Sequence, residues 1–306
     1  MRTVLVTGVA GFIGSWVART LIQRGLEVVG IDTSEERHRL RMLGLDLPVH
    51  RVDVRDWEGL RRLVSERPPQ AVIHLAALQI PGCRADPRTC VEVNVGGTVN
   101  LLELAREHGF PVVYASSAAV YGPELGRPLG EEEGVRPQTL YGVFKRTTEE
   151  CARVYGQDCG VPSAGLRPYV VYGPGRDQGL TSDVTQALRA AVRGEPFRIR
   201  FGGRIALQYA ADVAEAFVRC ALAPPQGARV YNLRGVVASV ADVVAAIEEV
   251  TGRRGLVTWE EDPIPIAADL SDTAFQQDYG PFPYRGLHDG LRETVEIWRA
   301  AGMLGA

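Results

Sequence analysis

Tyr141 and Lys145 are the pair of residues in this sequence whose types and spacing best suit acid–base chemistry. Lys145 is the only lysine among 34 Lys and Arg residues, so an ammonium occurs where the rest of the chain uses guanidinium. Residues i and i+4 share one face of an α-helix, and a nearby cation favours the phenolate. The pair therefore predicts a tyrosine that acts as general base or acid near neutral pH. The alternative is a packed tyrosine with a lysine extended beside it.

A glycine-rich turn near the start of the chain predicts a dinucleotide site. Thr3–Thr7 is a β-branched and apolar run, and Gly8, Gly11 and Gly14 follow it and lead into an amphipathic helix pattern. In a strand–turn–helix unit these glycines allow a tight turn, a close approach to a pyrophosphate, and helix packing on the sheet. The free N–H groups at the start of the helix then bind the phosphates.

The residue at the end of the second predicted strand indicates whether the dinucleotide is NAD or NADP. Glu27–Ile31 is followed by Asp32, 18 residues after Gly14. A carboxylate there accepts hydrogen bonds from the adenosine ribose and repels a 2′-phosphate, so NAD is predicted. Arg37 and Arg39 nearby keep NADP as an alternative.

The elements that position these residues alternate regularly between strand and helix. Predicted strands are Val49–Val54, Ala71–Leu75, Pro111–Ala115 and Ser163–Arg167, and predicted helices are Trp57–Arg67, Cys90–His108 and Tyr141–Tyr155. This order predicts an α/β fold with a Rossmann-type doubly wound parallel sheet. Ligands bind outside the carboxyl ends of such strands. His74 lies within an apolar run and is predicted to be a buried strand histidine, not a catalyst.

The alternation loosens after Pro168, which predicts a smaller C-terminal substrate-binding lobe. We expect residues 1–167 and about 205–235 to form the NAD-binding Rossmann domain, and residues 168–204 and 236–306 to form the substrate-binding lobe. Gly122–Pro137 is rich in Pro, Gly and Glu and predicts a loop at the mouth of the cleft. Glu131–Glu133 within it is interpreted as a solvated run.

Composition restricts the class of protein. The net charge is −3, with 45% hydrophobic and 23% charged residues, and this balance is typical of a soluble globular protein without nucleic-acid or membrane partners. The chain runs directly into a strand pattern and has no long apolar segment, so a cytoplasmic location without a signal peptide is expected. Five cysteines without a C-x-x-C pattern predict reduced thiols, with no disulfide framework and no metal site.

Several short motifs occur along the chain in a characteristic order. They are Gly8-x-x-Gly11-Phe-Ile-Gly14, Asp32, Asp53-Val54, His74-Leu-Ala-Ala77, Asn94-Val-x-Gly-Thr98, Ser116-Ser-Ala-Ala-Val-Tyr-Gly122 and Tyr141-x-x-x-Lys145. In this order they resemble the extended short-chain dehydrogenase/reductase superfamily, and more narrowly its NAD-dependent sugar epimerase/dehydratase group. The resemblance is dense from residue 3 to about 175 and weaker afterwards.

The resemblance implies a role for each matching residue. Tyr141 becomes the acid/base, Lys145 its partner and ribose ligand, and Ser117 the hydroxyl that binds the reacting oxygen. The implied NAD contacts are Gly8, Gly11, Phe12, Ile13, Gly14, Asp32, Asp53, Val54, Leu75, Ala76, Ala77, Asn94, Tyr141, Lys145 and Tyr169. The expected substrate contacts are Gln79, Arg84, Ser117 and Arg176. A homodimer, paired through the helices at Cys90–His108 and Tyr141–Tyr155, is also implied. Ala118 and Ala119 stand where the dehydratase branch carries an acid pair, so water elimination lacks its proton shuttle.

The second lobe departs from the pattern of nucleotide-sugar members. Nucleotide-sugar members hold the diphosphate of the substrate with an asparagine and with arginines. At the corresponding positions this sequence has Val170, Ile205 and the arginine-free segment Asp262–Ile266. A buried diphosphate without charged donors is poorly compensated. We therefore expect NAD-dependent oxidoreduction of a non-nucleotide sugar or sugar acid, by a dehydrogenase or an epimerase. A UDP-sugar 4-epimerase, with other arginines on the diphosphate, is one alternative. A non-catalytic NAD-sensing Rossmann protein is another, although it would not need Ser117, Tyr141 and Lys145 together.

Overall fold

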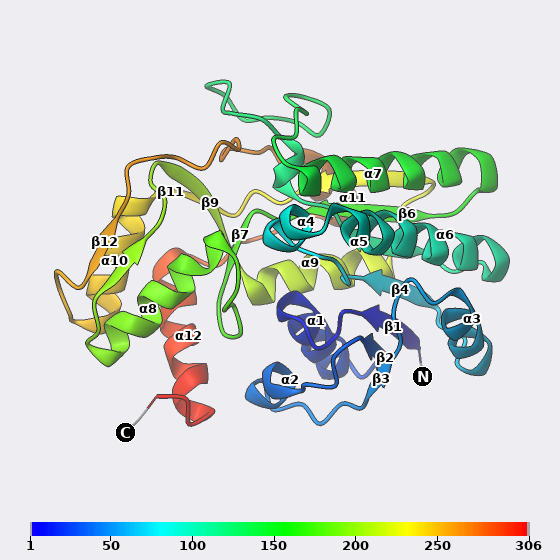
Figure 1. Cartoon of the computed structure of the whole chain (residues 1–306), viewed down its shortest axis with the longest axis horizontal. Helices are drawn as coiled ribbons and strands as arrows, with labels where there is room; N and C mark the ends of the chain where they lie inside the picture. Colours follow the sequence, from blue (N-terminus) through cyan, green and yellow to red (C-terminus); the bar gives the residue numbers. More distant parts are fainter. Residues whose placement is uncertain (1, 305–306) are drawn as a thin grey trace.

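The computed structural model describes residues 2–304 and contains a seven-stranded parallel sheet (Figure 1). Its strands are β1 (Thr3–Thr7), β2 (Glu27–Asp32), β3 (Val49–Arg51), β4 (Ala71–His74), β5 (Val112–Ala115), β6 (Ser163–Arg167) and β10 (Ala228–Asn232). They lie in the order β10-β6-β5-β4-β1-β2-β3. The predicted Rossmann-type fold is confirmed.

Helices cover both faces of this sheet because its strands are apolar on both sides. Val4 and Val6 pack into one core cluster with residues of α1 (Phe12–Gln23) and α9 (Ala210–Leu222). Leu5 points the other way, into a cluster with residues of α3 (Trp57–Glu66) and α6 (Gly97–His108). Helix α7 (Leu140–Cys159) lies beside α6, over β6 and β10. Alternate strand residues thus build two separate cores, as a buried parallel sheet requires.

The order of the strands sets the place of the site. Strand β1 has β2 and then β3 on one side, and β4, β5, β6 and β10 follow on the other. The direction of winding therefore reverses between β1 and β4. Crevices form at the carboxyl ends of the strands at such a point, and dinucleotides bind there.

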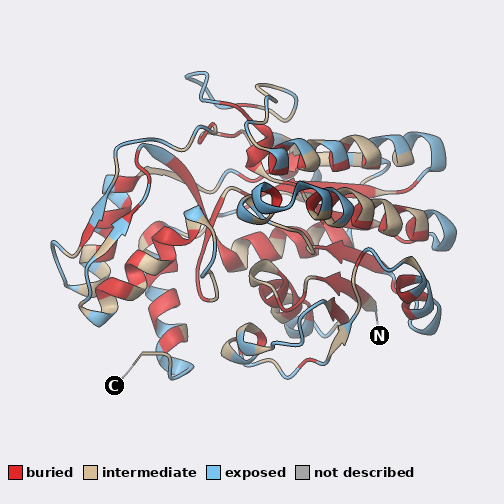
Figure 2. Cartoon of the chain, in the orientation of Figure 1, coloured by how far each residue is buried: buried red, intermediate tan, exposed pale blue. Residues whose placement is uncertain are grey.

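The smaller region, at the left of Figure 1, is built on a three-stranded sheet. Its strands are β7 (Val170–Tyr172), β9 (Arg204–Tyr209) and β11 (Val236–Ser239); β8 (Phe197–Ile199) pairs separately with β12 (Val257–Trp259). Helices α8 (Asp183–Arg193), α10 (Val240–Thr251) and α12 (Leu287–Ala300) surround them. Strand β9 belongs to the small sheet, and the chain returns to the large one with α9 and β10. The division into two domains stays a prediction, since one core cluster contains residues of both regions. Figure 2 shows buried residues in both regions.

Short elements interrupt stretches that the sequence predicted as continuous or irregular. They are α2 (His38–Met42), α4 (Ile80–Ala85), α5 (Pro87–Val91), a π-helical turn (Glu92–Gly96), two 3₁₀ turns (Ala118–Val120 and Leu180–Ser182) and α11 (Thr273–Tyr279). The predicted helix Cys90–His108 is therefore three successive segments. None of the helices in residues 2–304 combines the length and the apolar composition needed to cross a membrane.

The prediction that all the cysteines are reduced is wrong for two of them. Cys83 in α4 and Cys90 in α5 form a disulfide, with their Cα atoms 4.9 Å apart. The two short helices meet at Asp86, which caps α5, and this break folds the chain back enough to bring the thiols together. Neither an odd number of cysteines nor a spacing of seven residues indicates such a turn. Cys151, Cys159 and Cys220 are free thiols.

The loop Gly122–Pro137 contains no helix or regular strand, as predicted, but its acidic run is not simply solvated. Glu131 accepts a hydrogen bond from the backbone N–H of Asn232 at 3.1 Å. Glu133 accepts one from the N–H of Gly130 at 2.9 Å and pairs with Arg127 at 2.7 Å. Only Glu132 of the three is exposed. The acids fix the loop because Glu133 satisfies a backbone donor within it and Glu131 ties it to the end of β10.

Candidate active site

Tyr141 lies in the first turn of α7, held against the turn that carries Ser117. Thr139 caps the helix by accepting a hydrogen bond from the N–H of Gly142 at 3.1 Å. Gly142 lies directly against the carbonyl of Ala119, where a Cβ atom would not fit. The Tyr141 side chain is 8% exposed and packs with Ala119 and the Cys83–Cys90 disulfide. The glycine after the tyrosine is thus what lets this helix approach the Ser117 turn.

The Tyr141 phenol lies close to the Ser117 hydroxyl, but the pKa of the phenol differs from the prediction. Burial raises the pKa of Tyr141, while the nearby Ser117 hydroxyl and the charge of Arg176 oppose that rise. The predicted lowering of this pKa by Lys145 is wrong, because Lys145 is not among the groups that shift it. The Lys145 ammonium donates to the carbonyl oxygen of Ala115 at 2.6 Å and lies 5.5 Å from the centroid of the Tyr141 ring. The two side chains share a helix face without a direct hydrogen bond.

Lys145 is itself perturbed, which matters for its role. Burial lowers the pKa of its ammonium to about 8, against a smaller opposing effect of the Glu149 carboxylate. A lysine with a pKa near neutrality exchanges its charge within the working range of an enzyme. Its environment is therefore that of a group linked to proton transfer, and a surface cation would not be perturbed in this way.

Glu149 and Arg167 are supporting residues of the site that the sequence did not reveal. Glu149 continues the series Tyr141, Lys145 at the next i+4 position, and it pairs with Arg167 at 2.7 Å; both side chains are buried. The Ser116 hydroxyl donates to Glu149, and Arg167 donates to the Tyr121 hydroxyl at 2.6 Å. Ser116 is therefore structural, in keeping with the choice of Ser117 as the substrate-binding serine. Arg167 in the otherwise uncharged strand β6 could have indicated this ion pair from the sequence, because a buried charge requires a partner.

His74 behaves as predicted. Its ring nitrogens lie 2.7 Å from the Thr7 hydroxyl and 3.1 Å from the Thr98 hydroxyl. Burial, together with the charge of Lys145, lowers its pKa to about 3. His74 is neutral at physiological pH and ties β4 to β1 and α6.

The turn between β1 and α1 has the shape that a dinucleotide pyrophosphate requires. Gly8 has φ +67°, and a Cβ atom there would lie 2.8 Å from the backbone nitrogen of Ala76. Gly11 caps α1, whose first turn contains no acidic residue. Leu75 and Ala76 donate their N–H groups to the Thr7 hydroxyl at 3.2 and 3.1 Å. These features fit NAD, with Phe12, Ile13 and Gly14 at the positive end of the helix.

The environment of Asp32 also fits NAD better than NADP. Its carboxylate accepts hydrogen bonds from the N–H groups of Ala10 and Ser34, both at 3.1 Å. Arg39 pairs with Asp177 at 2.7 Å, and Arg37 lies 3.5 Å from Asp46. Both arginines that kept NADP open are thus engaged with carboxylates.

Most of the remaining predicted cofactor residues follow the ends of strands, Asn94 lies in the π-helical turn Glu92–Gly96, and several have other partners. Asp53 pairs with Arg55 at 2.7 Å, and the hydrogen bond with Arg55 is the main reason that its pKa is lowered. Asn94 is buried and bonds both the N–H and the carbonyl of Leu78, at 2.8 and 3.0 Å. Val54 is a buried member of one core cluster, Tyr169 is partly buried against another, and Ala77 follows β4. Their contacts with NAD stay predictions.

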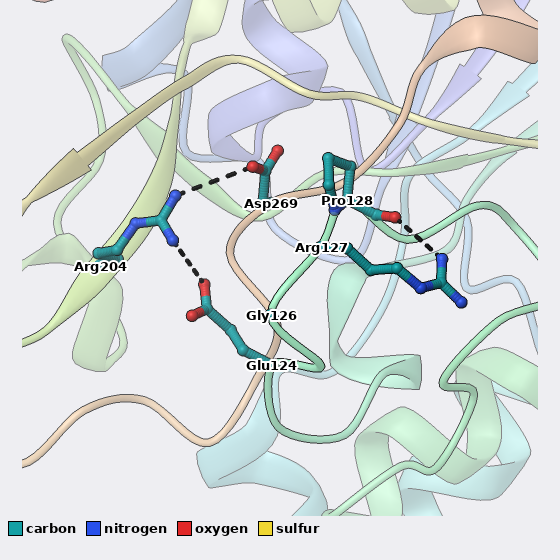
Figure 3. Close-up of a pocket in the computed structure, with 6 residues that line it drawn as sticks. All are labelled: Glu124, Gly126, Arg127, Pro128, Arg204 and Asp269. Carbon is teal, nitrogen blue, oxygen red and sulfur yellow. Dashed lines mark hydrogen bonds and ion pairs between the residues drawn. The ribbon is translucent and has the colours of Figure 1, made fainter.

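Among the predicted substrate residues, Gln79 and Arg84 are exposed in and before α4, and Arg176 is partly buried. Val170 and Ile205 are fully buried in the small sheet. Arg204, beside Ile205, faces Glu124 and Asp269, each at 3.8 Å. These three residues line a pocket of about 80 Å³ with Gly126, Arg127 and Pro128 (Figure 3). Ser117, Tyr141 and Lys145 do not line it. No cluster of three or more residues able to hold a metal occurs in residues 2–304.

The winding of the sheet, the glycine turn and the set formed by Ser117, Tyr141 and Lys145 define an extended short-chain dehydrogenase/reductase. Residues 4–233 match the NAD dependent epimerase/dehydratase family. The chain belongs to this family, and the predicted NAD-dependent enzyme class is confirmed.

Relatives within the family are named for sugar epimerisation. UDP-glucose 4-epimerase 4 of Oryza sativa subsp. japonica is 33% identical, over 83% of this chain and 78% of its own length. A probable UDP-glucuronate 4-epimerase of Rhizobium meliloti is 32% identical, over 72% of this chain and 68% of its own. The crystal structure of a Thermus thermophilus UDP-glucose 4-epimerase in complex with NAD is 32% identical, with a TM-score of 0.85, and the match covers 98% of this chain and 99% of that one.

Proposed function

We propose that this chain is an NAD-dependent epimerase that inverts a secondary alcohol carbon of a sugar linked to uridine diphosphate. The observation that carries the proposal is the similarity, along nearly the whole chain, to a UDP-glucose 4-epimerase structure with NAD. This similarity favours a nucleotide sugar over the free sugar that we expected from the sequence.

The proposed reaction uses the residues around Tyr141. The Tyr141 phenolate takes the proton from the sugar hydroxyl and becomes the phenol, and the neighbouring Ser117 hydroxyl holds the same substrate oxygen. Bound NAD supplies the acceptor for the hydride from the same carbon. Lys145 would move from Ala115 toward the phenol and ribose, and its cation then favours the phenolate. Return of hydride and proton to the other face of the keto sugar completes the inversion.

A second candidate is a free sugar or sugar acid, and it rests on one observation. Val170 and Ile205, at the positions where nucleotide-sugar members carry diphosphate ligands, are apolar and fully buried. A diphosphate would then depend on other cations, such as Arg204, which faces two carboxylates. A free substrate needs no such ligands.

Calorimetric titration separates the two candidates. NAD-loaded protein is titrated with UDP, UDP-glucose, glucose and glucuronate under identical conditions. A nucleotide-sugar epimerase should bind UDP and UDP-glucose at about micromolar concentrations, because charge-assisted contacts to a diphosphate contribute several kcal/mol. Binding of UDP no tighter than millimolar, with tighter binding of a free carbohydrate, would refute the proposal and favour the second candidate.

We also propose a homodimer paired through α7 and its neighbours. Leu140, Val143 and Val154 on α7 and Val91 on α5 are large apolar residues that are 39–48% exposed. Apolar side chains gathered on neighbouring helices suit an interface. Sedimentation equilibrium tests this, and Val143→Glu should give monomers. The cytoplasmic location remains a prediction, to be tested by cell fractionation.

A further inference from the structure

Arg39 joins three separate segments of the chain. It lies in α2, shortly after the strand that ends in Asp32, and its side chain is 14% exposed. Its Nη1 donates to the carbonyl of Ala10 in the glycine turn at 3.3 Å, and its Nε donates to the carbonyl of Gly175 at 3.0 Å. Its Nη2 donates to both carboxylate oxygens of Asp177, at 2.7 and 2.8 Å. One guanidinium therefore ties the turn expected to hold the pyrophosphate to the loop that follows β7.

The loop after β7, residues 173–179, lies against the start of the first helix. The indole of Trp16 in α1 donates to the carbonyl of Pro174 at 3.0 Å. A Cβ atom added to Gly175 would lie 3.5 Å from the Phe12 ring, so the backbone of the loop packs directly on the first turn of α1. The free N–H groups of that turn are the ones expected to bind phosphate. The loop is thus placed beside the entrance to the cofactor site.

The two attachments of this loop differ in exposure. Trp16 is 2% exposed and its hydrogen bond to the loop is buried, whereas the side chain of Asp177 is 39% exposed. Gly173 and Gly179, with φ of +135° and +84°, flank the loop and permit changes of its backbone that other residues resist. The side of the loop that Arg39 holds is therefore the side from which it can open, while Trp16 keeps the other side attached.

We propose that Arg39 and Asp177 form a clasp that must open for NAD to enter or leave. This role requires that the protein use NAD, which the family match shows, and it is independent of the sugar that reacts. While the clasp is closed, the loop prevents exchange of the dinucleotide. Retention suits an enzyme that returns its hydride to the sugar, because the reduced cofactor then has no need to leave. An ion pair that only joins two surfaces would affect stability alone.

Stopped-flow fluorescence of NADH measures exchange in both directions. Association is followed on mixing the protein with NADH, and dissociation on mixing NADH-loaded protein with excess NAD. The variants are Arg39→Met, Asp177→Ala and the two together. Arg24→Met is the control, because it removes an ion pair with Glu215 at the other end of α1. The thermal midpoint and the affinity for NADPH are measured for each variant.

We expect Arg39→Met to raise both the association and the dissociation rate constants of NADH by roughly 10-fold, the effect of losing charge-assisted hydrogen bonds. Both should rise because opening precedes entry as well as exit, so the dissociation constant changes less than either rate constant. Asp177→Ala should have a smaller effect, since the bonds from Arg39 to the carbonyls of Ala10 and Gly175 remain. The double variant should exchange NADH no faster than Arg39→Met, and Arg24→Met should match the unmodified protein.

Four results would overturn the inference. Unchanged rate constants in Arg39→Met, whatever its thermal midpoint, would make the pair a structural contact. Faster dissociation with unchanged association would make Arg39 a direct ligand of NAD. A loss confined to NADPH would assign Arg39 to a 2′-phosphate, and equal acceleration in Arg24→Met would show that losing any ion pair on α1 loosens the site. Each would leave the proposed epimerase intact, because formation of an epimer does not depend on the rate of NAD exchange.

Discussion

The large sheet and the small sheet of this protein differ in how closely their residues follow the family pattern. On the large sheet, Gly8, Asp32, Ser117 and Tyr141 lie at strand ends or on the helix that follows, where cofactor and chemistry belong. On the small sheet, the positions expected to hold a diphosphate are occupied by Val170 and Ile205, whose apolar side chains are buried. We therefore expect the large sheet to define the chemistry and the small sheet to define the choice of substrate.

The largest effect should come from the acid/base itself. Tyr141→Phe removes the proton-transferring hydroxyl while keeping the buried ring, so turnover should fall by roughly 10² to 10⁴-fold with NAD affinity nearly unchanged. Initial-rate kinetics and an NAD titration measure the two quantities. Tyr155→Phe, on the same helix but away from Ser117, is the control. Near-normal turnover in Tyr141→Phe would remove the basis for assigning chemistry to the large sheet.

Lys145→Arg should have the next largest effect. A planar guanidinium cannot occupy the place of the ammonium beside Ala115 and the Tyr141 ring, although it keeps the positive charge. We expect turnover to fall by about 10-fold or more, a smaller loss than in Tyr141→Phe. Rates measured from about pH 6 to pH 10 are the readout, since this range spans the pKa of Lys145, which burial lowers to about 8. An unchanged rate and pH profile would show that any cation suffices there.

Asp32→Ala should change cofactor preference and leave the choice of sugar alone. The variant loses hydrogen bonds to the ribose and a charge that repels a 2′-phosphate, so the preference for NAD over NADP should shrink by about 10-fold. Fluorescence titrations with both dinucleotides measure the ratio. Equal affinity of the unmodified protein for NAD and NADP would mean that Arg37 or Arg39 leaves its carboxylate partner to bind the phosphate.

A smaller effect concerns stability in acid. Because burial lowers the pKa of folded His74 to about 3 from an ordinary 6.5, the unfolded chain binds more protons between these values. The stability that His74 contributes as a neutral group is therefore complete above pH 6.5 and is lost as the pH falls toward 3. His74→Gln should reduce this loss between about pH 7 and pH 4.5, measured by urea unfolding. His288→Gln, at an exposed residue of α12, should retain it. The same pH dependence in both variants would show that protonation of His74 does not control stability.

The sequence predicts the large sheet well because its signals are local. Alternating strands and helices, three glycines and a tyrosine–lysine spacing are each contained in a few residues, and the structure places them as expected. The small region was less predictable, since β7, β9 and β11 are short strands that pair across long separations in sequence.

The sequence predicted which residues form the candidate site better than it predicted their pKa values. The expectation that Lys145 lowers the pKa of Tyr141 followed from spacing alone, whereas in the packed fold burial raises this pKa and the opposing groups are Ser117 and Arg176. Likewise the disulfide of Cys83 with Cys90 depends on a turn between two short helices that neither composition nor cysteine spacing indicates.

The most direct test of the central claim is proton NMR of UDP-glucose and UDP-glucuronate incubated with purified protein and NAD, with NADH absorbance followed in parallel. We predict that the 4-epimer of at least one sugar appears, that no NADH accumulates, and that Tyr141→Phe forms the epimer far more slowly. Accumulation of NADH with an oxidised product and no epimer, or turnover of free sugars only, would contradict the account.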